Sequence, residues 1–507
     1  MKCGASLREA ASGGAAVVTV PRSRKVTQWA AFVVIALLGL AVRLPQLGTK
    51  PMHTDEAVNA YIVGEVLAGR SFPYDARDRH GPVLAAVAWP LVRVQGAKSF
   101  AELTEAELRL TTVLAGTLTV MLFGAGVECF GLVPCLVGAV LMAASSLPVY
   151  YDRYFIHESL FVCATFGLML SGWRLWQRGG LGNAAVVGAC AAVMLACKET
   201  AVIHFAALAV GALCVWWTRR SAPSGLRLRW IVITVGIFLA VCLALFTWLG
   251  REWSVLAAFT HVWPAYFARA HGAGHEKPFG YYARLVAGNG SGAMVCALAC
   301  VGVWRTVRQR AGSAREFLVV YAVAIGLIYS VIPYKTPWLA LNFWLPLVLL
   351  AGLGVDGLWH GLRESLKNST LAAGVGVALV CGATVLIAHD TRRLVFTDPA
   401  GEENPYAYAH TSEDLLGLAP AIDRLAAENG LTAPRIAVIA SDAWPLPWYL
   451  RRYPETGFWQ PTQKVASADF YVTTTAEAFD GEARGLRAEF FGLRPGVMVL
   501  LWSPRPR

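Results

Sequence analysis

Long apolar runs recur through the chain, and their length constrains the fold more than any other feature of the sequence. A helix needs roughly 20 apolar residues to cross a bilayer. Runs near or above that length begin at about Trp29, Leu110, Leu132, Phe155, Asn183, Ala201, Trp230, Gly290, Phe317, Trp338 and Leu371. Because 56% of the 507 residues are hydrophobic and only 15% are charged, one water-soluble core cannot bury this surface. We predict a polytopic α-helical membrane protein with about eleven transmembrane helices.

Basic residues cluster before the first run and after every second run that follows, as expected of short cytoplasmic loops. The clusters are Arg22, Arg24 and Lys25; Arg174 and Arg178; Arg219, Arg220, Arg227 and Arg229; Arg305, Arg308, Arg310 and Arg315; and Arg363 with Lys367. This predicts a cytoplasmic N-terminus, and an odd number of spans places the C-terminus outside. The net charge of +11 reflects this bias and attraction to anionic lipids, so nucleic-acid binding is not predicted.

The first run is followed by Arg43-Leu44-Pro45 without a small-residue cleavage pattern, so we expect it to stay as an anchor in the inner (plasma) membrane. We predict three regions: a cytoplasmic tail at 1–25, a transmembrane domain at 26–389, and an extracytoplasmic α/β domain at 390–507. Within the transmembrane domain, the external loop 48–107 should carry interfacial helices at 55–68 and 82–95. The aromatic segment 251–290 suits either a membrane-interface belt or a cap over a site.

In the C-terminal region, helical spacing covers 415–429, and strands are expected at 435–440, 468–473 and 497–502. Their alternation predicts a small, mostly parallel sheet. The Pro-rich segment 444–451 follows the first of these strands, where it could form either a site or an aromatic surface that packs against the membrane domain.

Cysteine and histidine spacing favours neither a disulfide framework nor a metal site. The first external loop and the chain after Cys381 contain no cysteine, and no CxxC pair occurs. His261, His271 and His275 lack a neighbouring carboxylate pattern. A divalent ion is therefore possible but not indicated, and no cofactor is predicted.

Charged residues recur at the predicted outer ends of the spans. His53-Thr54-Asp55-Glu56 follows the first span, and by itself it could be an ordinary helix start with Thr54 as N-cap and two first-turn acids. Similar clusters follow at further outer loops: Arg77-Asp78-Arg79-His80, Asp152-Arg153, His157-Glu158, Lys198-Glu199 and Lys335. Charges near hydrocarbon are usually paired or functional, so their recurrence on one face predicts a common pocket.

A carboxylate beside several fixed cations suits displacement at a sugar carbon whose leaving group is a lipid-linked phosphate. The carboxylate takes the proton of an acceptor hydroxyl, and the cations stabilise the departing phosphate.

The motifs around these clusters resemble those of a known family. They are Met52-His53-Thr54-Asp55-Glu56-Ala57, His80-Gly81-Pro82-Val83-Leu84, the segments 151–158 and 197–200, Tyr334-Lys335-Thr336-Pro337-Trp338, and 444–451. Together they cover nearly the whole chain and look like the membrane-embedded GT-C glycosyltransferases. The chain is similar to the protein O-mannosyltransferase and aminoarabinose transferase branch, and most similar to a subgroup labelled flippase-activity-associated.

The resemblance implies a polyprenyl-phosphate-sugar donor, inversion at the anomeric carbon, and an acidic base that falls on Asp55 with Glu56 beside it. It also implies a phosphate-contacting arginine, which falls on Arg153. The family often shows an Asn-Asp pair where this chain has His157-Glu158. From the residues we place His53 and His80 around the acceptor, Lys198 and Lys335 near the phosphate, and Glu199 among the substrate-binding residues.

The expected partners are a lipid-linked sugar donor, membrane lipids, and a glycan, lipid or protein that supplies the acceptor hydroxyl. Two rival functions remain. The protein could assist translocation of a lipid-linked saccharide without making a bond, or it could be a scaffold whose external domain recruits other envelope proteins.

Overall fold

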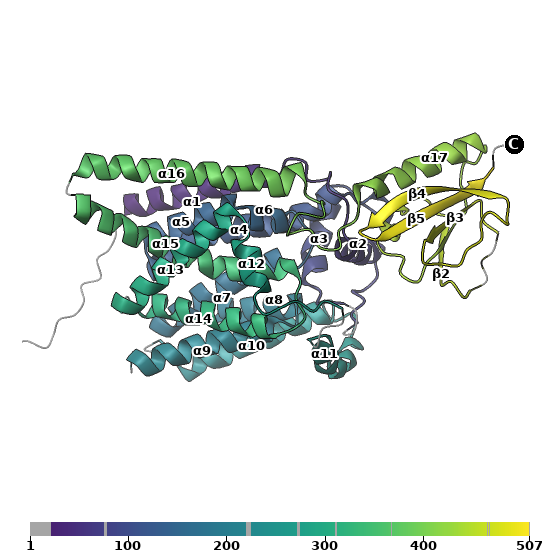
Figure 1. Ribbon diagram of the computed structural model, residues 1–507. Coiled ribbons are helices and arrows are strands. Elements are labelled where there is room, and N and C mark those ends of the chain that lie inside the picture. Colours follow the sequence, from purple (N-terminus) through teal and green to yellow (C-terminus); the bar gives the residue numbers. More distant parts are fainter. Residues whose placement is uncertain are drawn as a thin grey trace, which may run out of the picture.

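The structure, a computed structural model, describes residues 22–75, 79–219, 225–270, 274–309, 312–366, 368–463, 465 and 467–505. It consists of an elongated helical bundle with a smaller α/β domain at one end (Figure 1). The first helix begins at the far end of the bundle from that domain. Of the predicted tail at 1–25, all but the last four residues lie outside the described chain, and those four belong to the first helix.

Most helices of the bundle correspond to the predicted apolar runs, and the run that begins at Leu132 is divided between two of them. They are α1 (Arg22–Arg43), α4 (Glu105–Phe130), α5 (Leu132–Ala144), α6 (Ser146–Asp152), α7 (Glu158–Arg178), α8 (Leu181–Cys197), α9 (Ala201–Arg219), α10 (Leu228–Phe246), α13 (Gly290–Gln309), α14 (Ser313–Val331), α15 (Ala340–Leu366) and α16 (Ser369–Thr391). Among the described residues, nine helices are long and apolar enough to cross a membrane, and α5 with α6, bent by 57°, would make a tenth. The 17-residue α8 is shorter than these, so the predicted count of eleven is not confirmed.

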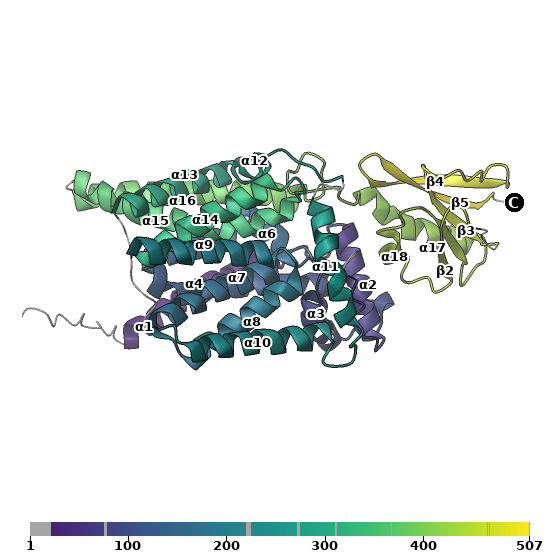
Figure 2. The same ribbon diagram turned by 90° about the horizontal axis from the view of Figure 1, so that it is seen from below.

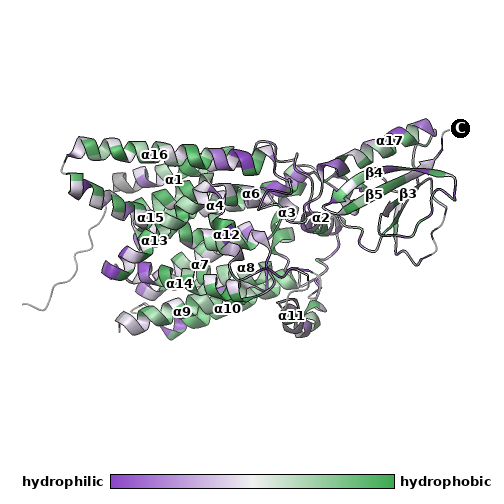
Figure 3. Ribbon diagram, in the orientation of Figure 1, coloured by the Kyte–Doolittle hydropathy of each residue, from purple (hydrophilic) through white to green (hydrophobic). Residues whose placement is uncertain are grey.

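The bundle has a buried centre and an apolar exterior. Nearly all of the first half of α15 is buried, whereas α10 and α16 expose leucine and valine side chains along most of their length. Apolar residues cover the helices and polar residues gather toward their ends (Figure 3). A helix surface of this kind is stable in hydrocarbon rather than in water.

Small residues allow α13 and α15 to approach closely. A Cβ atom at Gly302 would lie 2.0 Å from the carbonyl oxygen of Leu350, and one at Gly354 would lie 2.0 Å from that of Leu298. Neither position can therefore hold a larger residue without separating the helices. Small side chains at such crossings are typical of helix packing in membranes.

Shorter helices lie at the end of the bundle next to the α/β domain, among them α2 (Thr54–Leu67), α3 (Val83–Val94) and α11 (Val255–Ala270) (Figures 1 and 2). The predicted helices at 55–68 and 82–95 are thus found as α2 and α3. The N-cap of α2 is His53 rather than the predicted Thr54, because the His53 ring accepts from the Asp55 N–H and Glu56 closes a capping box. The segment after α11 contains α12 (Tyr281–Ala287).

The C-terminal domain holds α17 (Leu418–Glu428) and α18 (Leu446–Tyr449) with the strands β1 (Ile436–Ile439), β2 (Thr456–Trp459), β3 (Phe470–Thr474), β4 (Leu486–Arg494) and β5 (Val497–Pro504). The strand order is β2-β1-β3-β5-β4. Strand β1 pairs in parallel with β2 and β3, but β5 is antiparallel to both β3 and β4. The prediction of a mostly parallel sheet is therefore wrong: it missed β2 and β4, and β4 forms a hairpin with β5.

The segment 444–451 joins this domain to the bundle. The Tyr449 hydroxyl accepts from the N–H of Met52 at 2.8 Å, and Trp448 Nε1 donates to Glu105 at 2.8 Å. The segment 444–451 therefore packs against the bundle through Trp448 and Tyr449, whereas Trp444 lines the cavity described below. Both predicted alternatives hold for parts of this segment. The contact with Met52 fixes the chain just before α2, where the predicted site begins.

Candidate active site

A cavity of about 350 Å³ lies between the end of the bundle and α2. Its wall combines residues that are far apart in the sequence. They come from α2, from α3 and the segment before it, from the start of α7 and the residues before it, from the α8–α9 connection and the first turn of α9, from α11, from the C-terminal end of α14 and the segment after it, and from the C-terminal domain. The polar residues of the wall include Asp55, Asn59, Arg79, His80, His157, Glu158, Lys198, Glu199, Tyr266, Tyr329 and Tyr334.

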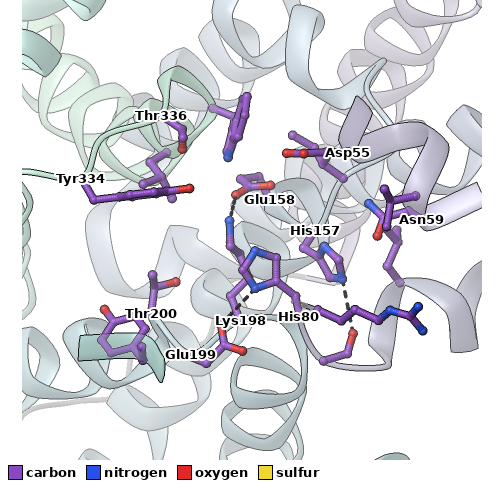
Figure 4. A pocket seen from close by; sticks show the side chains of 18 of the residues that line it. Asp55, Asn59, His80, His157, Glu158, Lys198, Glu199, Thr200, Tyr334 and Thr336 are labelled. Atoms are coloured by element: carbon purple, nitrogen blue, oxygen red, sulfur yellow. Dashed lines mark hydrogen bonds and ion pairs between the residues drawn. The ribbon is translucent and has the colours of Figure 1, made fainter. Parts of the chain in front are cut away.

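Asp55 occupies the first turn of α2 and faces this cavity, where it is half-buried (Figure 4). Among the described residues, no donor forms a hydrogen bond with its carboxylate. The helix start stabilises a negative charge at this position. Asp55 is therefore a fixed carboxylate with both oxygens available to a ligand.

His53 holds the start of α2 and does not line the cavity. Its Nδ1 accepts from the Asp55 N–H at 3.0 Å, and its Nε2 donates to the carbonyl oxygen of Tyr408 at 3.0 Å. Burial lowers the pKa of His53, and this keeps the ring neutral, as the accepting Nδ1 requires. The structure thus makes His53 a positioning residue rather than the predicted contact to the acceptor.

Glu56 also turns away from the cavity, which corrects its predicted catalytic role. Its two oxygens lie 2.8 Å from Nε and Nη2 of Arg109, and they also accept from the N–H groups of Phe155 at 2.8 Å and His53 at 3.1 Å. Burial by itself would raise the pKa of this carboxyl, but the charge and hydrogen bonds of Arg109 lower it to about 2. Because it is fully buried and fully bonded, Glu56 anchors α2 to α4.

An ion pair and a hydrogen-bonded pair line the cavity opposite Asp55. Lys198 pairs with Glu158, and Nδ1 of His80 lies 3.0 Å from a Glu199 oxygen (Figure 4). Burial would lower the pKa of Lys198, but the Glu158 carboxylate raises it above its ordinary value. Lys198 therefore stays protonated, and the pair leaves donors of its ammonium group for a ligand.

His157 lies next to these pairs as a neutral ring. Its Nε2 lies 3.3 Å from the Gly81 carbonyl oxygen, and its ring centre lies 5.4 Å from that of His80. Burial lowers the pKa of His157 well below its ordinary value, and His80 and Lys198 lower it further. The neutral ring thus donates to Gly81 and joins the segment before α3 to the start of α7.

Two predicted phosphate contacts lie outside the cavity. The Arg153 guanidinium donates to the carbonyl oxygens of Arg43, Pro45 and Gln46 at 2.5–3.0 Å. The Lys335 ammonium donates to the carbonyl oxygens of Lys277, at 3.2 Å, and Ile332. Backbone carbonyls, whose positions cannot be inferred from the sequence, bind both cations, and neither cation lines the cavity that Asp55 faces. The structure therefore brings together Asp55, His80, His157, Glu158, Lys198 and Glu199, but not His53, Glu56, Arg153 or Lys335.

Several residues of the wall were not among the predicted site residues. Asn59 is four positions after Asp55, so helical spacing puts it on the same face of α2, a signal the sequence does contain. Arg79 adjoins the predicted His80. Tyr334 and Trp444 belong to motifs that were noticed, but only the tertiary structure turns them toward the cavity.

Comparison with known proteins identifies solved structures that share this fold. No protein-family model matches the sequence, and no curated protein matches it. The structure is similar to that of ArnT from Cupriavidus metallidurans bound to undecaprenyl phosphate, with a TM-score of 0.65 and 15% sequence identity over 94% of this chain and 98% of that chain. The chain shares the fold of that structure.

Two further solved structures share this fold. The archaeal oligosaccharyltransferase AglB from Archaeoglobus fulgidus, in complex with an inhibitory peptide and a dolichol-phosphate, gives a TM-score of 0.55 at 11% identity, over 86% of this chain and 65% of that chain. The arabinofuranosyltransferase AftD from Mycobacteria gives 0.51 at 13% identity, over 96% of this chain and 40% of that chain. The fold class inferred from the sequence motifs is thereby confirmed.

Proposed function

We propose that this protein is a membrane glycosyltransferase that moves a sugar from a polyprenyl-phosphate donor to an acceptor hydroxyl. One observation carries the proposal: a carboxylate without a hydrogen-bonding partner among the described residues, Asp55, faces the same cavity as the protonated Lys198. The structural neighbours include one protein bound to undecaprenyl phosphate and one bound to a dolichol-phosphate. Those ligands support a lipid phosphate as the leaving group.

In the proposed reaction, Asp55 accepts the proton of the acceptor hydroxyl while the hydroxyl oxygen bonds to the anomeric carbon of the sugar. The bond between that carbon and the phosphate oxygen breaks, and the lipid phosphate leaves with the electron pair. Attack from the side opposite the leaving group inverts the anomeric configuration. Asp55 is the general base of this step.

Lys198 is the proposed partner of the departing phosphate, and the hydroxyl of Tyr334 lies in the same wall. Glu158 keeps Lys198 charged, and the buried pair needs no reorganisation when charge develops on the phosphate. We assign His80, which is paired with Glu199, and Asn59 to contacts with sugar or acceptor hydroxyls, because both line the same cavity. The cavity opens at the end of the bundle beside the C-terminal domain, which the distribution of basic residues assigns to the extracytoplasmic side of the plasma membrane.

The test uses purified full-length protein and membranes that supply the acceptor pool, with a radiolabelled polyprenyl-phosphate sugar as donor. Asp55→Asn should lower the release of free lipid phosphate by about 10²-fold or more, as expected for loss of a general base. Glu65→Gln makes the same chemical change further along α2, outside the cavity, and should leave the rate unchanged.

Undiminished release by Asp55→Asn would refute the assignment of the base. A wild-type protein that moves the donor across vesicles without releasing lipid phosphate would instead be a translocator. If Asp55→Asn supports envelope assembly normally while removal of residues after Asp390 abolishes it, the scaffold function would be correct.

A further inference from the structure

A second, much smaller cavity lies outside the proposed active site, where the segment between α1 and α2 meets α4, α6 and the segment after α16. Its volume is about 10 Å³, and its wall includes Gln46, Thr49, Lys50, Tyr150 and Arg153, with Arg109 at its base. Gln46 and Thr49 are exposed, so the cavity lies close to solvent at the outer end of α1. A volume of this size accommodates one species about as large as a water molecule.

Lys50 is the unusual residue of this wall. The residue is only 6% exposed, and its ammonium nitrogen forms no hydrogen bond with any described residue. The ammonium lies over the rings of Tyr150 and Tyr154, 4.4 and 4.1 Å from their centres. These cation–π contacts offset part of the cost of burying the amine. They do not provide an oxygen or nitrogen acceptor for its N–H donors, which remain without a hydrogen bond among the described residues.

The charges around the cavity do not balance. Arg109 is paired with Glu56, and Arg43 is paired with Asp152 at 2.8 Å. Within the described chain, Lys50 and Arg153 have no carboxylate in ion-pair contact. The wall therefore contains two basic side chains beyond those that buried carboxylates neutralise. Burial lowers the pKa of Lys50 well below its ordinary value, as expected of a buried amine without a counter-ion.

Nearby acceptors are already used. The carbonyl oxygens of Leu47 and Lys50 accept from Arg109, and that of Gln46 accepts from both Arg153 and the Thr49 hydroxyl. The Tyr150 hydroxyl donates to the carbonyl oxygen of Pro399. A water molecule here would meet donors and few free acceptors, whereas an anion would satisfy the donors and reduce the excess charge.

We propose that this cavity binds a single monatomic anion of halide size, held by Lys50 and Arg153. The cavity volume favours a halide over a phosphate or a lipid headgroup, both of which need several times more space. Lys50 lies three residues before His53, and its carbonyl oxygen accepts from the arginine that anchors Glu56. Anion binding would therefore stabilise the segment that leads into Asp55.

The experiment measures thermal unfolding of the purified protein in an uncharged detergent, with sodium gluconate replaced by sodium bromide at constant ionic strength. Bromide should raise the midpoint by several degrees, with saturation, because a ligand of the folded state stabilises it by mass action. Sulfate at the same ionic strength should raise the midpoint only as an excluded ion does, without saturation and equally in the wild type and in Lys50→Met. Lys50→Met should remove the bromide response, whereas Lys98→Met, an exposed lysine of the same external loop, should keep it.

Equal midpoints in bromide and gluconate would overturn the proposal, and so would an unchanged bromide response in Lys50→Met. A rise produced only by phosphatidylglycerol, without a halide effect, would assign the site to a lipid headgroup and also overturn it. If Lys50→Met does not fold, anomalous scattering from bromide in crystals of the wild-type protein decides: a peak within about 3.5 Å of the Lys50 ammonium supports the site, and no peak refutes it. None of these measurements depends on the proposed transferase activity.

Discussion

Replacing Glu56 by glutamine should destabilise the protein strongly, although the change removes only a charge and no volume. Glu56 is fully buried, and its two oxygens accept four hydrogen bonds, two of them from Arg109. An amide has one oxygen, and its NH₂ group would face N–H donors. Arg109 would be left as a buried charge without a partner, a change that costs about 3–5 kcal/mol.

The pKa of Glu56 gives a second value for the same interaction. The fall from 4.5 to about 2 corresponds to about 3 kcal/mol at about 1.4 kcal/mol per pH unit. Because the folded-state pKa is the lower one, this stability is present above about pH 4.5 and is lost as the pH falls toward 2.

The assay is equilibrium unfolding in mixed micelles, followed by tryptophan fluorescence, with Glu65→Gln as the matched control on α2. Glu56→Gln should lose about 3–5 kcal/mol of unfolding free energy, and the double variant Glu56→Gln with Arg109→Met should recover part of that loss because neither charge remains. A Glu56→Gln protein within about 0.5 kcal/mol of the control, the usual range for surface changes, would refute the anchoring role.

Two further predictions concern the cavity. Lys198→Met should lower the rate of lipid-phosphate release by about 10²-fold. Lys198→Arg should lower this rate less, because arginine keeps the positive charge. Equal rates in the two variants would show that Lys198 does not act through its charge. Since burial lowers the pKa of His157, unfolding takes up a proton there and stability should fall as the pH drops below about 6.5. His157→Gln should flatten that dependence between about pH 6.5 and 5, and an unchanged slope would contradict the neutral ring.

The sequence by itself determined the elements of the bundle. Bilayer thickness sets the length of an apolar helix, so every predicted run is found as a helix or, for the run that begins at Leu132, as the bent pair α5 and α6. The predicted helices at 55–68 and 82–95 are found as α2 and α3. The motifs also pointed to the fold that was found, although the solved structures that share it are only 11–15% identical to this chain. Both signals are local, and for that reason they can be read without knowing which segments meet.

Only the tertiary structure decided which charged residues form the site. Asp55 and Glu56 are adjacent, but successive residues of a helix point about 100° apart, so one faces the cavity and the other faces Arg109. Arg153 and Lys335 lie at the predicted end of the bundle, yet backbone carbonyls take their donors. The antiparallel pairing of β5 depends in the same way on contacts distant in sequence. Partner choice among buried polar groups is a property of the packed chain, and no local pattern encodes it.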